Sequence, residues 1–255
     1  MKNIILAANW KLNKSPAETR RFFKTFFDEG KKKSFYAQIG KQFQVVFFPS
    51  TISLEATSES VKDSEVRFGG QNIYSESQGA FTGENSAKVI KELNGHYALI
   101  GHSERRQYFH ESNSFLNKKI HHALKSDLIP MYCIGETLEE RESGKTEAVL
   151  LAQLTEGLKE ITSANGKTLV VAYEPVWAIG TGKIATADQV KETHAFVQKT
   201  LAKLDLEQTP ILYGGSVKAA NAQELIQIPH VSGFLVGGAS LEAAAFLDLI
   251  QNSLA

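Results

Sequence analysis

The sequence contains almost no cysteine. Cys133 is the only one among 255 residues, so no disulfide can form within the chain. Disulfides persist mainly in secreted and periplasmic proteins, whereas cytoplasmic proteins keep their thiols reduced. We therefore expect a cytoplasmic protein that is held together by its packed core rather than by covalent cross-links.

Excess charge is absent as well. The sequence has 28 basic and 28 acidic residues, which give a net charge of +0. Nucleic-acid-binding domains usually present a basic surface, and this balance argues against one. Long apolar runs are also missing, because none approaches the roughly 18 residues of a membrane span. We therefore expect neither a nucleic-acid partner nor a membrane partner.

Short apolar runs of strand length recur along the chain. They fall at residues 4–8, 43–48, 66–70, 97–100, 129–134, 168–173, 210–213 and 233–236. Several are apolar on both faces, as parallel strands are when helices cover both sides of the sheet. Strand and helix patterns alternating eight times predict an α/β fold, a (β/α)8 barrel that forms a single domain over residues 1–255. An open doubly wound sheet is the alternative.

Three helix starts are predicted from capping boxes. Ser15, Thr186 and Asn221 are each followed three residues later by Glu or Gln, which is the pattern of an N-cap residue. One connection, residues 71–86, shows neither helical nor strand periodicity. Its apolar residues Tyr74 and Phe81 favour a loop that docks onto another molecule, and a self-packed surface loop is the alternative.

Polar and glycine residues follow several predicted strands, where the active sites of such barrels lie. They are Asn9 and Lys11 after the first strand, His102 after the fourth, Glu174 after the sixth, Gly214, Gly215 and Ser216 after the seventh, and Gly237 and Gly238 after the eighth. Taken alone, each has a structural interpretation, such as a solvated charge or a turn. Together, a base, an acid, a cation and glycine N–H groups that can cradle phosphate indicate proton transfer on a small phosphorylated substrate.

Five segments resemble the signature segments of the triosephosphate isomerase family. They are NWK at 9–11, GHSERR at 101–106, YEPVWAIGTGK at 173–183, YGGS at 213–216 and LVGGASL at 235–241. They occur in the order of the family and span nearly the whole chain. The resemblance implies a (β/α)8 TIM barrel that interconverts dihydroxyacetone phosphate and glyceraldehyde 3-phosphate. It implies no metal and no cofactor, because only protons move.

The resemblance also implies a role for each site residue. Glu174 would remove a proton from the carbon beside the carbonyl, and neutral His102 would polarise the carbonyl oxygen. Lys11 and Asn9 would stabilise the enediolate, while Glu104 would orient the region around Lys11. The residues that would bind substrate are Asn9, Lys11, Gly180, Ser216, Gly237 and Gly238.

The segment after the base resembles the lid of the family, which closes over the intermediate and keeps water out. Its residues are Pro175, Val176, Trp177, Ala178, Ile179, Gly180, Thr181, Gly182, Lys183, Ile184 and Ala185. Tyr213 and Ser216 would hold the closed lid, and Ile179 with Leu235 would clamp the carboxylate of Glu174 between apolar side chains.

Residues 71–86 resemble the dimer loop of the family, so the resemblance implies a homodimer. Thr82 would reach the neighbouring active site, and Glu84 would pair with Arg105 of the partner subunit. Two alternatives to the isomerase remain open at this point. One is an aldolase that forms a Schiff base on Lys11, and the other is a non-catalytic phosphate-binding protein with the same fold.

Overall fold

The structure, a computed structural model, describes residues 4–163, 169–179 and 183–255. The described residues form eight strands, which close into one barrel in chain order with all neighbouring strands parallel. The strands are β1 (Ile4–Asn9), β2 (Phe43–Phe48), β3 (Arg67–Gly70), β4 (Tyr97–Ile100), β5 (Ile129–Ile134), β6 (Val170–Tyr173), β7 (Ile211–Tyr213) and β8 (Gly233–Val236). Because β8 pairs with β1, the predicted barrel is confirmed and the open-sheet alternative is wrong.

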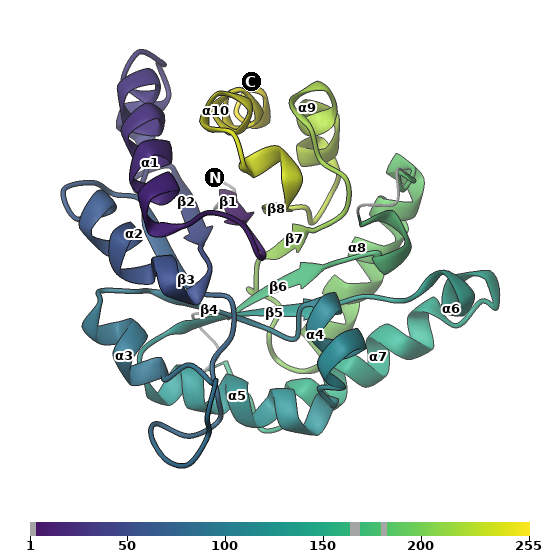
Figure 1. Cartoon of the computed structure of the whole chain (residues 1–255). Coiled ribbons are helices and arrows are strands. Elements are labelled where there is room, and N and C mark those ends of the chain that lie inside the picture. Colours follow the sequence, from purple (N-terminus) through teal and green to yellow (C-terminus); the bar gives the residue numbers. More distant parts are fainter. Residues whose placement is uncertain (1–3, 164–168, 180–182) are drawn as a thin grey trace.

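Helices surround the barrel, as Figure 1 shows. They are α1 (Pro16–Gly30), α2 (Leu54–Val61), α3 (Ala87–Glu92), α4 (Ser103–Phe109), α5 (Asn113–Lys125), α6 (Leu138–Glu142), α7 (Thr146–Gly157), α8 (Ala187–Lys203), α9 (Ala219–Gln227) and α10 (Ala243–Ser253). Short 3-10 turns are η1 (Tyr36–Gln38), η2 (Thr51–Ser53), η3 (Val176–Ala178) and η4 (Gly238–Ser240). None of the helices within the described ranges is long and apolar enough to span a membrane.

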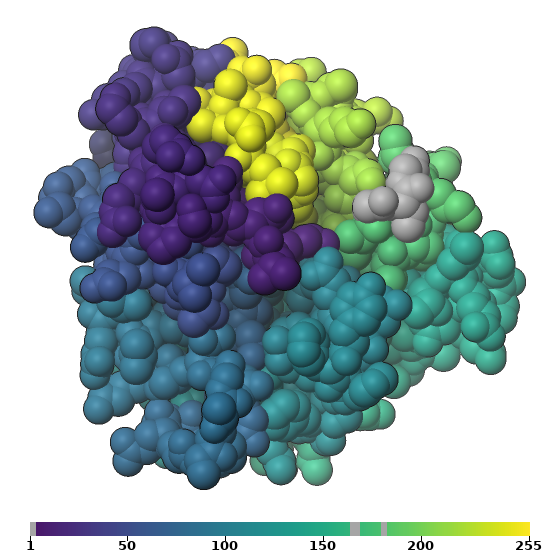
Figure 2. Space-filling model, in the orientation of Figure 1, coloured from purple at the N-terminus to yellow at the C-terminus, as the bar shows by residue number. Residues whose placement is uncertain are grey.

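The strands separate two parts of the core, because successive side chains of a strand point to opposite faces. On β1, Ile5 and Ala7 pack with the residues that fill the barrel, and Leu6 and Ala8 pack with the layer between strands and helices. Cys133 is fully buried in the inner part. Closure also brings the chain ends together, and Figure 2 shows the purple segment after β1 beside the yellow segment after β8.

Most predicted boundaries agree with the structure, and one predicted helix start does not. Ser15 and Thr186 cap α1 and α8 as capping boxes, which confirms both. Asn221 is not an N-cap, because α9 begins two residues earlier at Ala219. Alanines at 219 and 220 favour the helix, and the side chain of Asn221 instead accepts a hydrogen bond from the N–H of Lys218 at 2.8 Å. The predicted strand at 168–173 begins at Val170, and Thr168 lies outside the described residues.

The connection between β3 and α3 contains neither helix nor strand, as predicted for residues 71–86. It packs on itself through the rings of Tyr74 and Phe81, whose centroids lie 4.2 Å apart. Asn72 anchors its base, because its amide donates to Glu84 at 2.8 Å and its carbonyl accepts from Lys119 at 2.7 Å. The loop is therefore ordered by its own contacts, while residues 76–83 at its tip are exposed.

A buried histidine makes the stability of this barrel depend on pH. His194 of α8 is fully buried and packs edge-on against the ring of Tyr173. Its Nδ1 lies 3.3 Å from the carbonyl oxygen of His230, and its Nε2 has no hydrogen-bond partner in the described part of the chain. Burial lowers the pKa of His194 from 6.5 to about 4, since a charged imidazolium there would lose its water.

We expect acid to destabilise the protein through this residue. Between pH 6.5 and about pH 4 the unfolded chain binds a proton at His194 that the folded chain does not bind. The free energy of unfolding should therefore decrease by about 3 kcal/mol over that range from this group alone. Urea unfolding of a His194→Phe variant should lack that part of the pH dependence, whereas His110→Asn, at an exposed position with a left-handed backbone, should retain it. An unaltered pH dependence in His194→Phe would contradict this account.

Candidate active site

A cleft of about 410 Å³ opens at the carboxyl end of the barrel. It gathers predicted site residues from several strand ends: Asn9, Lys11, His102, Glu104, Glu174, Ala178, Ile179, Gly214, Gly215, Ser216, Leu235, Gly237 and Gly238. Residues more than 200 positions apart in the sequence therefore line the same cleft. Gly180, Thr181 and Gly182, which were predicted for the lid, lie outside the described residues.

Glu174 follows β6 and is almost completely buried, with 2% of its surface exposed. Its Oε2 accepts a hydrogen bond from the backbone N–H of Ser103 at 3.1 Å, and its Oε1 lies 3.0 Å from Nε2 of His102. Burial raises the pKa of Glu174, but His102, the Ser103 N–H and Lys11 together outweigh it and hold the pKa below the usual 4.5. The carboxylate is therefore ionised near neutral pH.

Two glycines allow the backbone around Glu174 to pack closely. A Cβ atom on Gly214 would lie 2.8 Å from Cγ of Glu174, and one on Gly135 would overlap the carbonyl oxygen of Glu174. Neither position has room for a side chain. Gly214, the first glycine after β7, therefore has a packing role at Glu174, in addition to the phosphate role that the sequence suggested for it.

His102 is the N-cap residue of α4. Its Nδ1 accepts a hydrogen bond from the backbone N–H of Glu104 at 3.3 Å, so Nδ1 holds no proton in this arrangement. The ring is then a neutral imidazole whose proton is on Nε2, the nitrogen that faces Glu174. A neutral imidazole at this place can donate a proton and also accept one.

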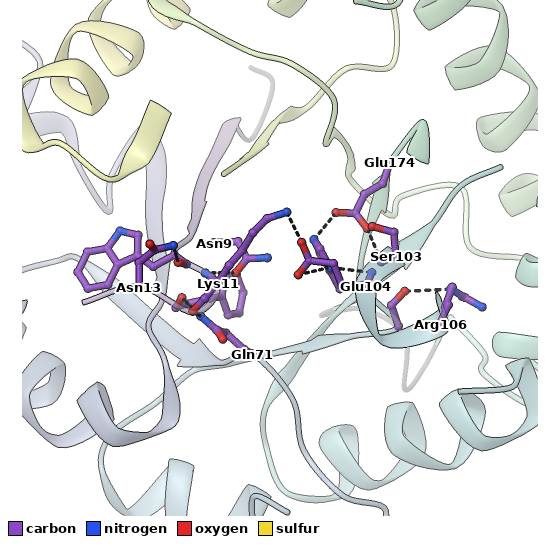
Figure 3. Close-up of polar contacts among 12 residues, drawn as sticks. Asn9, Lys11, Asn13, Gln71, Ser103, Glu104, Arg106 and Glu174 are labelled. Carbon is purple, nitrogen blue, oxygen red and sulfur yellow. Dashed lines mark hydrogen bonds and ion pairs between the residues drawn. The ribbon is translucent and has the colours of Figure 1, made fainter. Parts of the chain in front are cut away.

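Lys11 reaches across the cleft from the segment after β1 and meets Glu104, as Figure 3 shows. The distance between its Nζ and Oε1 of Glu104 is 2.6 Å. The backbone of Lys11 is left-handed, with φ of 51°, a conformation that costs free energy in any residue other than glycine. Asn9 accepts the N–H of Lys11 at 3.0 Å, and Gln71 donates to its carbonyl at 2.9 Å. These two contacts hold the strained backbone and so aim the side chain.

Sequence reasoning missed Gln71, and it also missed Glu136. Glu136 is fully buried, and its Oε1 accepts hydrogen bonds from the hydroxyl of Tyr173 at 3.1 Å and from the indole of Trp177 at 2.9 Å. Arg141 is at 3.1 Å from the same oxygen. Glu136 therefore fixes the start of the predicted lid. It stands two residues after β5, so the rule that polar residues after strands form the site could have found it.

The remaining predicted lid contacts are only partly described. Ser216 donates to the carbonyl oxygens of Ala178 at 2.9 Å and of Lys183 at 3.4 Å, so it touches both sides of the lid segment. Tyr213 is fully buried behind the cleft, and its hydroxyl has no partner within the described ranges. Ile184 is 59% exposed.

The predicted dimer residues lie outside the cleft. Thr82 is exposed at the tip of the loop between β3 and α3. Glu84 lies 3.9 Å from Arg105 of its own chain and also accepts from Asn72. The pairing of Glu84 with the partner subunit's Arg105 stays a prediction.

Comparisons with known proteins agree on one family. A family model described as triosephosphate isomerase matches residues 4–253. Triosephosphate isomerase of Bdellovibrio bacteriovorus is 56% identical over 245 residues, covering 96% of this chain and 98% of that protein. Its counterpart in Chlamydia trachomatis is 48% identical over 250 residues, covering 96% and 88%. The crystal structure of triosephosphate isomerase from Bartonella henselae is similar with a TM-score of 0.86, at 32% identity and over 100% of both chains.

Proposed function

The chain belongs to the triosephosphate isomerase family and interconverts dihydroxyacetone phosphate and glyceraldehyde 3-phosphate, and we propose that Glu174, His102 and Lys11 perform this reaction. Family membership removes the aldolase and the non-catalytic protein as alternatives. The observation that carries the proposal is the ionised, buried carboxylate of Glu174, which lies 3.0 Å from the neutral imidazole of His102 in the main cleft.

The chemistry needs one base on carbon and one proton carrier on oxygen. Glu174 removes a proton from C1 of dihydroxyacetone phosphate, and the electron pair moves into the C1–C2 bond and onto the carbonyl oxygen. Nε2–H of His102 donates its proton to that oxygen and then takes the hydroxyl proton from C1, while Glu174 returns its proton to C2. Protons balance over the cycle, and we propose no cofactor and no metal.

Positive charge and N–H groups stabilise the intermediate in this proposal. Lys11 is paired with Glu104, and the developing negative charge of the enediolate offers it a second anion. The amide of Asn9 lies beside it and can donate a hydrogen bond. Because these groups are already held in place, little reorganisation is needed when the charge develops.

The phosphate site is proposed at the loops after β7 and β8. A Cβ atom on Gly238 would have nothing within 4 Å, so open space lies beside that backbone. A Cβ atom on Gly237 would lie 3.5 Å from Cε of Lys11, which places the lysine next to the same loop. Ser216 lines the cleft from the neighbouring loop. The role of Gly180 rests on the family resemblance alone.

The first prediction tests the base. Glu174→Asp keeps the charge but withdraws it by about one bond length, so we expect kcat to fall by on the order of 10²-fold or more. The KM should change much less, because the phosphate loops are untouched. A coupled isomerisation assay measures both constants. If kcat stays at the wild-type value, Glu174 is not the base.

Lid closure should strengthen the base. Ile179 and Leu235 line the cleft beside Glu174, and we propose that they enclose its carboxylate when the lid closes. When the carboxylate of Glu174 turns from His102 and Ser103 toward the substrate, it loses the contacts that lower its pKa. Burial, which raises the pKa, then dominates. Loss of water disfavours the charged form, so the pKa rises.

We therefore expect proton uptake when the enediolate mimic 2-phosphoglycolate binds near neutral pH. Calorimetry in buffers with different ionisation enthalpies counts the proton. Ile179→Ala should take up less than the wild type and lose about tenfold or more in kcat/KM, equivalent to about 1.4 kcal/mol of transition-state stabilisation. Binding of the mimic to the wild type without any proton uptake would rule out this tuning.

A homodimer is supported by apolar side chains around the mouth of the barrel. Four exposed ones follow β1 to β4 in turn: Leu12 at 96%, Ile52 at 75%, Phe81 at 37% and Phe109 at 63%. Neighbouring loops thus present one apolar surface, which is typical of a protein interface. We propose that a second copy covers it and that Thr82 reaches the partner active site.

We further propose that the protein is located in the cytoplasm, since its single thiol is buried and unpaired.

A charge in this surface should separate the subunits. We expect Ile52→Glu to weaken the dimer at least about tenfold, because a buried unpaired carboxylate is costly. The monomers should have low activity, since Thr82 no longer braces a neighbouring site. Leu151→Glu is the matched control, because Leu151 is 44% exposed on α7, a helix that follows none of β1 to β4. Sedimentation that shows a fully active Ile52→Glu monomer, or an unweakened dimer, would refute the proposal.

A further inference from the structure

A buried tyrosine connects the two elements that hold Glu174 and His102. Tyr132 of β5 is fully buried. Its hydroxyl donates a hydrogen bond to the carbonyl oxygen of Gln153 at 2.7 Å and accepts one from Nη2 of Arg106 at 3.1 Å. We propose that Tyr132 is a positioning residue of the isomerase, which keeps the proposed base and the proposed proton carrier at the spacing that the reaction needs. The inference rests on the roles proposed above for Glu174 and His102.

The hydroxyl of Tyr132 fits its place closely. A Cβ atom on Gly157, at the end of α7, would overlap this hydroxyl, so the helix leaves room for Tyr132 because residue 157 is glycine. Cζ of Arg106 lies 5.5 Å from the centre of the tyrosine ring. A phenylalanine at this position would keep the ring and its packing but would lose the donated and the accepted hydrogen bond together.

A first series of contacts leads from Tyr132 to His102 through Arg106. Nε of Arg106 donates to the carbonyl oxygen of Gly101 at 2.9 Å (Figure 3), and Nη2 donates to the carbonyl oxygen of Cys133 at 2.9 Å. Gly101 directly precedes His102 and has a left-handed backbone, with φ of 73°. A Cβ atom on Gly101 would lie 3.2 Å from Nη2 of Arg106, so the guanidinium packs directly on this backbone. Arg106 therefore fixes the peptide that leads into the N-cap residue of α4.

A second series of contacts leads from Tyr132 to Glu174 through Gln153. The side chain of Gln153 binds Gly135 twice, because its Oε1 accepts the N–H at 2.8 Å and its Nε2 donates to the carbonyl oxygen at 3.0 Å. A Cβ atom on Gly135 would overlap the carbonyl oxygen of Glu174, so these two backbones are in contact. The N–H of Glu174 in turn donates to the carbonyl oxygen of Ile134 at 2.7 Å. A shift of α7 would therefore move the backbone on which Glu174 rests.

The two series end at the same contact. Oε1 of Glu174 lies 3.0 Å from Nε2 of His102, and Oε2 accepts the N–H of Ser103 at 3.1 Å. Because the hydroxyl of Tyr132 binds one residue of each series, its loss lets the start of α4 and the end of β6 drift relative to each other. A misplacement near 1 Å can cost about 10²-fold in rate, so a smaller drift should cost about tenfold.

The test compares two variants that each remove one buried tyrosine hydroxyl. Tyr132→Phe should lower kcat about tenfold and leave KM unchanged, since the proposed phosphate loops after β7 and β8 are untouched. Tyr97→Phe is the matched control. Tyr97 is 1% exposed, and its hydroxyl donates to Gln44 at 2.6 Å at the start of β4, the opposite end of the barrel from the cleft. Tyr97→Phe should lose a similar amount of stability in urea but keep the wild-type kcat.

A second pair of variants tests whether the hydroxyl acts through Arg106. Arg106→Lys keeps the charge but replaces a planar fork by one amine, which cannot bind Gly101 and Cys133 in the same way. It should lower kcat about as much as Tyr132→Phe does. The double variant should lose little more than either single variant, because both changes break the same series of contacts. Losses in kcat that multiply in the double variant would overturn the proposal.

The proposed function and this inference can be told apart by the same assay. If Glu174→Asp keeps the wild-type kcat, the base is misassigned and the inference falls with it. If Glu174→Asp loses kcat but Tyr132→Phe does not, the proposed function stands and the positioning role is wrong.

Three further results would overturn the positioning role. Equal falls in kcat for Tyr132→Phe and Tyr97→Phe would show that lost stability alone explains the effect. A rise in KM in place of a fall in kcat would show that the hydroxyl supports substrate binding instead. If Tyr132→Phe does not fold, Arg106→Lys decides the question, because a wild-type kcat in that variant would contradict the first series of contacts.

Discussion

The burial of one ionised carboxylate is the constraint on which the rest of this site depends. Glu174 is 2% exposed, so its charge needs compensation from the protein rather than from water. The start of α4 supplies most of it, through Nε2 of His102 and the N–H of Ser103. The same short helix start therefore positions His102, the proposed proton carrier, and keeps Glu174, the proposed base, ionised, so one contact couples the two groups.

Close backbone packing follows from the same constraint. Gly135 and Gly214 flank Glu174 where no Cβ atom would fit, and Glu136 holds Trp177 immediately after it. Strands β5, β6 and β7 thus fix Glu174 between them, and among the described residues the predicted lid is held at its beginning by Glu136 and also by Ser216. A rigid base beside a hinged cover is the arrangement that a reaction with a labile intermediate requires.

The sequence was sufficient to predict the fold and most of the cleft, because both depend on local patterns. Strands that are apolar on both faces, and polar residues directly after them, can be recognised one segment at a time. Gln71 and Glu136 were missed because their roles depend on distant contacts, with Lys11 60 residues away and with Trp177 41 residues away. Asn221 was misplaced because two alanines before it extend α9, and local propensity cannot say which of two possible starts a helix takes.

Closure of the barrel between β1 and β8 has a consequence for synthesis of the protein. Lys11 is made more than 220 residues before Gly237, which lies beside it in the folded protein. At roughly 5–20 residues per second, a ribosome needs more than ten seconds to join the two halves of the site. During that time β1 has no partner on one edge, and the nascent chain cannot yet turn over substrate. Activity therefore requires synthesis through β8, because a truncated product that lacks β8 also lacks one wall of the cleft.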